Sequence, residues 1–210
     1  ANRYHLRTSE IYLNEQSIGN IVTSVLPDTD INSLFTIKEG LGFQRKSFTT
    51  PVKCGDVIRL EHVVTQKNIH STQNKCHMNH HQEVISFGTN GHGDYFDNFM
   101  IQCANNIKEG SPLEGKYQFY LQNYQTKHFL ACNQRYMFNS RLLAGQIEVY
   151  GMQYKDNDAV WKIVGGYFFE KNEMALEEND ENDQNYVKKY GKIFDQEGYE
   201  IVSYRKKENI

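Results

Sequence analysis

The sequence has few of the residues that mark several common classes of protein. Its 210 residues include 3 Pro, 4 Cys and 1 Trp, and 23 Lys and Arg stand against 26 Asp and Glu. Without a basic excess the chain is poorly suited to a phosphate backbone, so we expect no nucleic acid partner. No apolar run approaches the roughly 20 residues that span a bilayer, so we expect no membrane span.

What the sequence does have is short segments in which apolar and polar residues alternate. Such alternation, rich in aromatic and β-branched residues, is typical of half-buried β-strands. Examples are DVIRLEHVV, EVISFG, YFDNFMIQC, KYQFYLQNY, QIEVYGM and AVWKIVGGYFF, separated by Gly- and Asn-rich breaks such as TNGHGD. We find no convincing amphipathic helix before residue 170, and these patterns predict an all-β fold.

Apolar residues recur along the chain in three sets that keep the same order. The sets are Leu6, Ile69 and Phe129; Val22, Val84 and Val149; and Phe35, Phe99 and Trp161. The spacings are 63 and 60 residues in the first set and 64 and 62 in the third. Any β protein shows some recurrence of Val and Phe, but the matching order and spacing favour a triplicated unit of about 60 residues. Such a unit indicates a β-trefoil, in which equivalent large residues meet near a pseudo-threefold axis.

These anchors divide the chain into units of about 1–50, 51–110 and 111–169. Units two and three open with a strand, in VIRLEHVV and YQFYLQNY, whereas unit one begins after the position of that strand. A trefoil without its first strand has an unpaired edge. We therefore expect that residues upstream of the chain, or another segment, fill the gap.

The composition changes at Glu170. Residues 170–185 are acidic and almost without large apolar residues, which predicts a flexible linker. Residues 186–210 return to alternation and predict a short extension, with IFDQEGYEIV as the two arms of a hairpin. We expect this extension to fold back onto the trefoil, to pair with its open edge or to engage a partner, rather than to be disordered.

The stretch NKCHMNHHQEVISFG contains four side chains that can bind a transition metal, Cys76, His77, His80 and His81. It fits either a metal site or a polar loop before a strand. Tetrahedral zinc sites usually draw their ligands from two well-separated pairs. Four ligands within six residues do not surround one ion easily, so we favour the loop and predict no metal.

Pairs of carboxylates recur before the third anchor of every unit. They fit general acid/base chemistry, a calcium loop or ordinary β-turns, and their recurrence favours turns. We find no nucleophile elbow and no phosphate-cradling loop, so we predict neither an enzyme nor a cofactor. The pairs are Asp28 and Asp30, Asp94 and Asp97, and Asp156 and Asp158.

Several motifs together resemble the MIR domain, and more closely the stromal cell-derived factor two family. They are Pro51 to Gly55, Ile69–His70, Gln82 to Val84, Gly91 to Asp94 and Trp161–Lys162, and the likeness covers about residues 3–170. The resemblance implies a β-trefoil of three MIR repeats without catalytic activity of its own. It also implies residence in the endoplasmic reticulum lumen, beside chaperones or protein O-mannosylation. Family members usually end in a retrieval tetrapeptide, whereas this chain ends in KKENI.

Four cysteines fit two disulfides or four free thiols, and their number alone does not decide. In a trefoil unit the first and last strands lie close together, and Cys54 and Cys103 flank these strands in unit two. They form either a disulfide or two buried thiols, and the oxidising lumen that the resemblance implies favours the disulfide. We expect Cys76 and Cys132 to be free.

A binding module fits the sequence better than an enzyme. His70 either contacts a ligand or bonds a backbone carbonyl in its own loop, and we favour the carbonyl. The other candidate ligand-binding residues are Gln82, Glu83, Asp94 and Tyr95 in unit two, and Tyr150, Tyr154 and Asp156 in unit three.

Two functions of different class remain open. The first is an adaptor that binds unfolded or O-mannosylated clients together with J-domain and heat-shock chaperones. The alternative is a carbohydrate-binding module that acts with a glycosyltransferase and binds mannosyl glycans. A structural subunit of a larger assembly is a further alternative, which would use the C-terminal extension.

Overall fold

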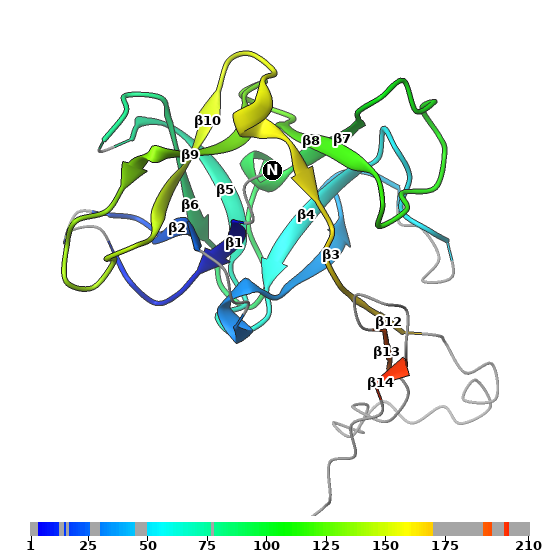
Figure 1. Cartoon of the computed structure of the whole chain (residues 1–210), viewed down its shortest axis with the longest axis horizontal. Coiled ribbons are helices and arrows are strands. Elements are labelled where there is room, and N and C mark those ends of the chain that lie inside the picture. Colours follow the sequence, from blue (N-terminus) through cyan, green and yellow to red (C-terminus); the bar gives the residue numbers. More distant parts are fainter. Residues whose placement is uncertain are drawn as a thin grey trace, which may run out of the picture.

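Regular structure in the chain is almost entirely β-strand (Figure 1). The computed structural model describes residues 4–12, 15, 17–25, 30–44, 50–76, 78–169, 191–194 and 200–201. The main sheet contains β1 (His5–Thr8), β2 (Asn20–Val25), β3 (Phe35–Glu39), β4 (Val57–His62), β5 (Asn68–Lys75), β6 (Gln82–Phe87), β7 (Phe99–Cys103), β8 (Gln118–Asn123), β9 (Phe129–Met137), β10 (Ile147–Met152) and β11 (Trp161–Lys162). Single turns of 3-10 helix precede β3, β7 and β11; they are η1 (Ile31–Ser33), η2 (Tyr95–Asp97) and η3 (Asn157–Ala159). The all-β prediction is confirmed.

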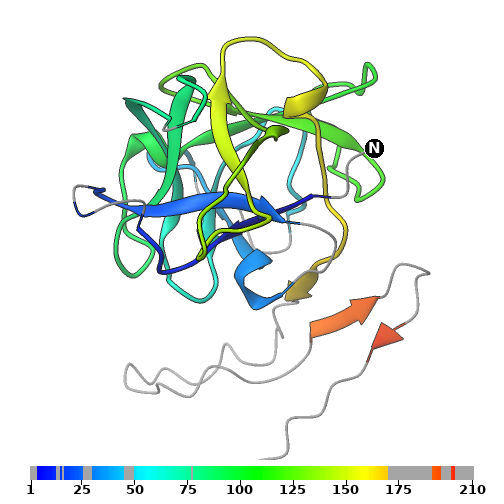
Figure 2. The same cartoon turned by 60° about the vertical axis from the view of Figure 1, so that its left-hand side comes forward.

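Strands β2, β6 and β10 pair with one another in a closed triangle. Each belongs to a hairpin, with β1, β5 and β9 as the partner strands, and the hairpins lie side by side (Figures 1 and 2). The contacts of the triangle follow one rule. The residue two positions before the anchor valine of one strand pairs with the residue two positions after the anchor valine of a neighbouring strand. These pairs are Asn20 with Ser86, Gln82 with Gly151, and Ile147 with Ser24. Such threefold pairing makes the chain a β-trefoil, as predicted.

The second set of anchors lies in the core, and the first set needs one correction. Val22, Val84 and Val149 pair with Thr8, Ser71 and Cys132. The residues two positions before these partners are Leu6, Ile69 and Leu130, which all contact the core cluster. The choice of Phe129 for unit three was therefore wrong by one residue. Phe129 lies in a separate cluster with Tyr150, because neighbouring residues of a strand point to opposite faces.

The third set of anchors occupies equivalent places in the three units. Phe35 and Phe99 pair with the last residues of the following first strands, His62 and Asn123. Phe99 and Trp161 pair with the second residues of their own first strands, Ile58 and Phe119. Equivalent registers confirm that these three aromatic residues are related by the threefold arrangement.

Beyond β11 the chain contributes a second, three-stranded sheet. It consists of β12 (Tyr167–Phe169), β13 (Gly191–Phe194) and β14 (Glu200–Ile201), all antiparallel. Strands β13 and β14 lie where the arms of a hairpin were proposed. The acidic linker of residues 170–185 lies outside the described residues, as does most of 186–210. The boundaries of units, linker and extension therefore stay a prediction.

Candidate functional site

The three 3-10 turns show how the repeated aspartates are used. Asp30, Asp94 and Asp156 cap η1, η2 and η3 by accepting the backbone N–H two residues ahead, at 2.9, 2.8 and 2.7 Å. These bonds satisfy donors that the start of each turn leaves free. The turn interpretation of the aspartates is thus confirmed for these three. The equivalent of Asp94 in unit one is Asp30, and Asp28 lies outside the described residues.

In unit two a buried polar network lies behind the turn. Asp97 is fully buried and accepts hydrogen bonds from the backbone N–H of Asp94 (3.0 Å) and from Asn68 Nδ2 (3.2 Å). Its Oδ1 bonds His70 Nδ1 at 2.8 Å, and His70 is itself buried. The expectation that His70 bonds a carbonyl of its own loop was therefore wrong. Its partner lies 27 residues away.

In unit three, the positions equivalent to those of the network carry apolar side chains. The strand registers place Phe129 and Ala131 where unit two has Asn68 and His70, and Ala159 where it has Asp97. These three residues are buried in an apolar cluster. Buried polar groups are costly unless they are fully bonded. Because unit three folds with an apolar filling, the network of unit two is not required by the trefoil itself.

The network also tests whether unit two could hold a metal ion. His70, Asp94 and Asp97 each present a ligand atom within 4.8 Å of the others. The atoms are already engaged, since Asp97 Oδ1 bonds His70 and Asp94 Oδ1 accepts from Phe96 N–H. A metal ion at this place would compete with these two bonds. That the chain binds no metal stays a prediction.

A partly exposed surface adjoins the turn η2, and we call it the aromatic rim: Phe43, Asp94, Tyr95 and Tyr124. The three aromatic residues are 39, 54 and 38% exposed, in this order. The rings of Phe43 and Tyr124 meet edge to face at 5.1 Å. Tyr95 lies against Gly42, the residue before Phe43. A Cβ placed on Gly42, which has a φ of +80°, would lie only 2.9 Å from Tyr95 Cε1. The rim thus combines exposed aromatic rings with one carboxylate.

The loop that carries Phe43 is fixed to unit two by Asn98. This side chain donates Nδ2–H to the carbonyl of Leu41 (3.0 Å), and its Oδ1 accepts the N–H of Leu41 (2.8 Å). On the other side Lys127 lies 4.3 Å from the centre of the Tyr124 ring. Three units therefore contribute to the rim. Asp94 and Tyr95 were identified from the sequence, whereas Phe43 and Tyr124 were missed. No spacing in the sequence indicates that these two residues lie close together.

The remaining candidates of unit two do not join this surface. Gln82 and Glu83 lie on β6, where they pair with Gly151 and Tyr150 of β10. Glu83 accepts a hydrogen bond from Thr72 Oγ1 at 3.0 Å. Gln82 is buried. The four candidates of unit two are therefore divided between two places.

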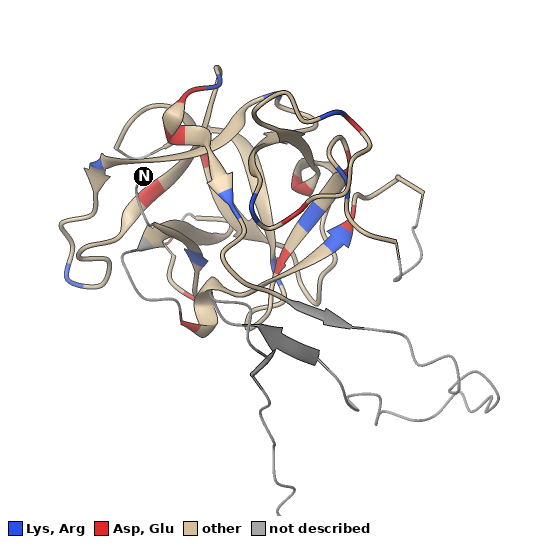
Figure 3. Ribbon diagram, turned by 45° about the vertical axis from the view of Figure 1, so that its right-hand side comes forward, with Lys and Arg blue, Asp and Glu red and all other residues tan. Residues whose placement is uncertain are grey.

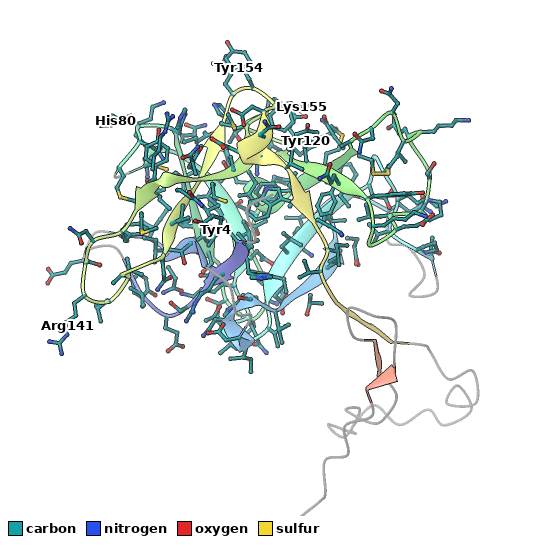
Figure 4. The ribbon with its side chains drawn as sticks, in the orientation of Figure 1. Tyr4, His80, Tyr120, Arg141, Tyr154 and Lys155 are labelled. Carbon is teal, nitrogen blue, oxygen red and sulfur yellow. A yellow bond between two sulfur atoms is a disulfide. The ribbon has the colours of Figure 1, made fainter. Side chains whose placement is uncertain are left out.

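The candidates of unit three also differ in exposure. Tyr150 is buried, its ring stacks on His81 at 4.8 Å, and burial raises the pKa of its hydroxyl. Tyr154 is 71% exposed and projects from the loop after β10 (Figure 4). Asp156 caps η3 at the end of the same loop. Only Tyr154 and Asp156 of this set are presented to solvent.

The cysteines and the histidine-rich stretch can now be placed. Cys54 and Cys103 form a disulfide, and Cys76 and Cys132 are free thiols, as predicted. Cys76 is buried with its Sγ 3.3 Å from the carbonyl of Gln82, and burial raises the pKa of its thiol. His80 is exposed on the loop between β5 and β6 (Figure 4), and His77 lies outside the described residues. Within the described part of the chain, none of these side chains belongs to a group of close metal ligands.

Charged side chains do not form a face of one sign. On the side shown in Figure 3, basic and acidic residues are interspersed over the strands and loops. Lys38 and Glu61, for example, form an ion pair on β3 and β4.

His62 provides a test of how pH acts on the fold. It is fully buried, and burial lowers the pKa of its imidazole. As the pH falls below about 6.5, His62 of the unfolded chain takes up a proton, whereas burial opposes its protonation in the folded chain. The free energy of unfolding therefore decreases below that pH. Asn123 holds the equivalent position and donates Nδ2–H to the carbonyl of Phe96 at 2.6 Å.

We expect His62→Asn to reduce the loss of thermal stability between about pH 7.5 and about pH 5.5. The measurement is the melting temperature of both proteins across this range. His80→Asn, which changes an exposed histidine, is the control and should leave the pH dependence as it is. An equal loss in His62→Asn and in the parent protein would contradict the assignment.

The threefold strand pairing and the three capped turns define a β-trefoil. No family model matches the chain. It is 32% identical to human stromal cell-derived factor 2-like protein 1 over 169 residues, which are 80% of this chain and 72% of that protein. The chain belongs to the stromal cell-derived factor 2 family.

Solved structures agree with this assignment. The SDF2-like protein from Arabidopsis thaliana matches with a TM-score of 0.68 at 26% identity, over 76% of this chain and 84% of that one. The S. cerevisiae protein O-mannosyltransferase Pmt1-Pmt2 complex matches with a TM-score of 0.62 at 20% identity, over 75% of this chain and 22% of that one, and shows the fold alone. Among the described residues, no helix has the length and apolar character needed to cross a bilayer.

Proposed function

We propose that the chain is a non-enzymatic adaptor that binds extended segments of unfolded or O-mannosylated client proteins at the aromatic rim. The observation that carries this proposal is the cluster of exposed aromatic rings of the rim, Phe43, Tyr95 and Tyr124, to which each unit contributes one. Rigid aromatic side chains supply large contact areas at a low cost in conformational entropy, and they are enriched among the residues that dominate binding energy. The disulfide between Cys54 and Cys103 lies in unit two, which carries Tyr95.

A binding role agrees better with the network than catalysis does. His70 and Asp97 are the pair that most resembles a general base and its orienting carboxylate. Both are buried, and the bond between them occupies His70 Nδ1 and Asp97 Oδ1. Their arrangement supports a role in holding the turn beneath Asp94 and Tyr95.

Membership of the family supports our proposals for the compartment and the partners. A disulfide is stable in the oxidising lumen of the endoplasmic reticulum and rare in the cytosol. We therefore place the adaptor in that lumen, together with J-domain and heat-shock chaperones. Recognition of O-mannosylated clients belongs to the same proposal, in line with the shared fold of the O-mannosyltransferase complex.

We expect Tyr95→Ala to weaken the binding of a reduced, alkylated and therefore unfolded polypeptide by about tenfold or more, as for an aromatic hot spot. The measurement is fluorescence anisotropy of the labelled polypeptide. Tyr154→Ala removes a tyrosine of unit three that is even more exposed, 71% against 54% for Tyr95, and is the matched control, which should bind like the parent protein. Equal affinities of the Tyr95→Ala variant and the parent protein would contradict the proposal.

A carbohydrate-binding role is the second candidate, and one observation favours it. Tyr154 presents its ring to solvent close to the exposed Asp156, the combination of an aromatic face and a carboxylate that suits a sugar. A glycan array separates the candidates. Mannoside binding that Tyr154→Ala abolishes would favour the carbohydrate role over the adaptor role.

A further inference from the structure

Asn74, Lys75 and Cys76 form an Asn-x-Cys tripeptide where β5 ends. N-linked glycans are attached to asparagine in Asn-x-Ser/Thr tripeptides whose middle residue is not proline. The third residue acts through its hydrogen-bonding side chain, and the thiol of cysteine, a weaker donor than a hydroxyl, replaces it with lower efficiency. The sequence contains no Asn-x-Ser/Thr tripeptide and no second Asn-x-Cys tripeptide. Asn74 is therefore the one asparagine of the chain in a tripeptide that suits this modification.

The fold leaves room for a glycan on Asn74. The last three residues of β5, Gln73 to Lys75, are exposed, whereas the five before them are buried. Asn74 Nδ2 donates a hydrogen bond to Glu83 Oε2 at 3.4 Å, at an exposed place. An asparagine amide has two N–H groups, and N-glycosylation replaces only one of them. A glycosylated Asn74 therefore keeps the donor that bonds Glu83.

The backbone around Asn74 departs from the regular ladder. The pairing of β5 with β6 is irregular between Ser71 and Lys75, and the backbone N–H of Asn74 bonds Thr72 Oγ1 of its own strand at 3.0 Å. Irregular pairing of this kind leaves residues without a partner across the strands and bends the strand locally. Asn74 thus lies at a bend of the hairpin with its side chain exposed.

Cys76 meets the other chemical requirement, because a cysteine that is held in a disulfide has no thiol to offer. Cys76 is a free thiol, and Cys54 pairs with Cys103 instead. In the fold Cys76 is buried, and its Sγ donates to the carbonyl oxygen of Gln82 at 3.3 Å. This burial does not prevent the modification, since the transferring enzyme acts on the extended chain before a hairpin such as β5–β6 closes.

We propose that Asn74 is an N-glycosylation site of the Asn-x-Cys type. The reaction joins Asn74 Nδ2 to the anomeric carbon of an oligosaccharide carried by a lipid pyrophosphate. The new C–N bond replaces the C–O bond to the pyrophosphate, which leaves with the electron pair of that bond, and Nδ2 loses one proton. The proposal rests on the luminal location proposed above, because the lipid-linked oligosaccharide is used on that side of the membrane.

The test expresses the whole chain behind a cleavable signal peptide in cells that carry out N-glycosylation. Because the signal peptide supplies the luminal location, a negative result counts against the site and leaves the proposed function as it is. The readout is the mass of the protein before and after treatment with peptide-N-glycosidase in heavy-oxygen water. This enzyme converts a glycosylated asparagine to labelled aspartate, so peptide mapping identifies the residue that carried the glycan.

Three variants accompany the parent protein. Asn74→Gln removes the acceptor at an exposed position, and we expect complete loss of the glycan. Cys76→Thr replaces the thiol with the preferred hydroxyl, and we expect the glycosylated fraction to rise above that of the parent protein. Asn139→Gln changes another exposed asparagine, which lies outside any such tripeptide, and should leave the glycosylated fraction unchanged.

We expect the parent protein to carry one glycan, on Asn74, in a part of the molecules. A parent protein without a glycan would overturn the proposal. If Cys76→Thr is then glycosylated, the thiol is not accepted, and if it is not, Asn74 itself is not reached. A Cys76→Thr variant that fails to fold still gives a result, because the glycan is attached as the chain enters the lumen and is measured in the total protein.

Discussion

Replacing Asp97 with alanine is expected to lower the free energy of unfolding by about 3–5 kcal/mol, as when one partner of a buried hydrogen-bonded pair is removed. The substitution leaves His70 Nδ1, Asn68 Nδ2 and the N–H of Asp94 without their acceptor. Asn68 and His70 are buried, so water cannot easily replace the carboxylate beside them. The measurement is urea unfolding followed by circular dichroism, with the parent protein measured under the same conditions.

Unit three supplies the matched controls for this variant. Asp156→Ala removes an exposed cap without touching a buried network, and its expected cost is about 1 kcal/mol. The triple variant Asn68→Phe, His70→Ala and Asp97→Ala gives unit two the apolar filling of unit three. It should recover at least half of the loss, because the buried donors of Asn68 and His70 are removed together with their acceptor. An Asp97→Ala variant no less stable than Asp156→Ala would contradict the assigned role of the network.

Loss of the disulfide is the second large effect that we expect. The bond between Cys54 and Cys103 closes a loop with a sequence separation of 49 residues. In the chain-entropy account, the double variant Cys54→Ser and Cys103→Ser loses about 3–5 kcal/mol, because the unfolded chain gains freedom. The measurement is again the free energy of unfolding in urea.

A reducing agent provides the internal control. It should destabilise the parent protein to the level of the double variant and leave the double variant unchanged. A parent protein whose stability does not respond to complete reduction, verified by thiol titration, would contradict a stabilising role for this bond.

Much of the fold could be predicted because the core repeats. Val22, Val84 and Val149 lie on strands that pair only with one another and their own hairpin partners, so similar environments selected the same residue. The error at Phe129 has a physical cause. Both Phe129 and Leu130 are large, apolar and buried, and a strand with two buried faces does not show which residue points to the shared core.

The site was less predictable than the fold. Capping by Asp94 could be inferred from local sequence, because a cap contacts the next two residues. The bond from His70 to Asp97 joins strand β5 to the turn η2, 27 residues further along the chain, and the contact between Phe43 and Tyr124 joins two units. Neither leaves a spacing rule in a single sequence. The separation in space of Gln82 and Glu83 from Asp94 and Tyr95 likewise depends on the pairing partner of β6, which a single sequence does not show.

The central claim is that unit two is a trefoil unit modified to hold a binding surface, with the buried network supporting the turn of Asp94 and Tyr95. The most direct measurement is the affinity of the triple variant Asn68→Phe, His70→Ala and Asp97→Ala for the unfolded polypeptide. Circular dichroism would first confirm that the variant is folded. We predict an affinity lower by about tenfold or more, as for the loss of a binding hot spot. A folded triple variant that binds as tightly as the parent protein would contradict the claim.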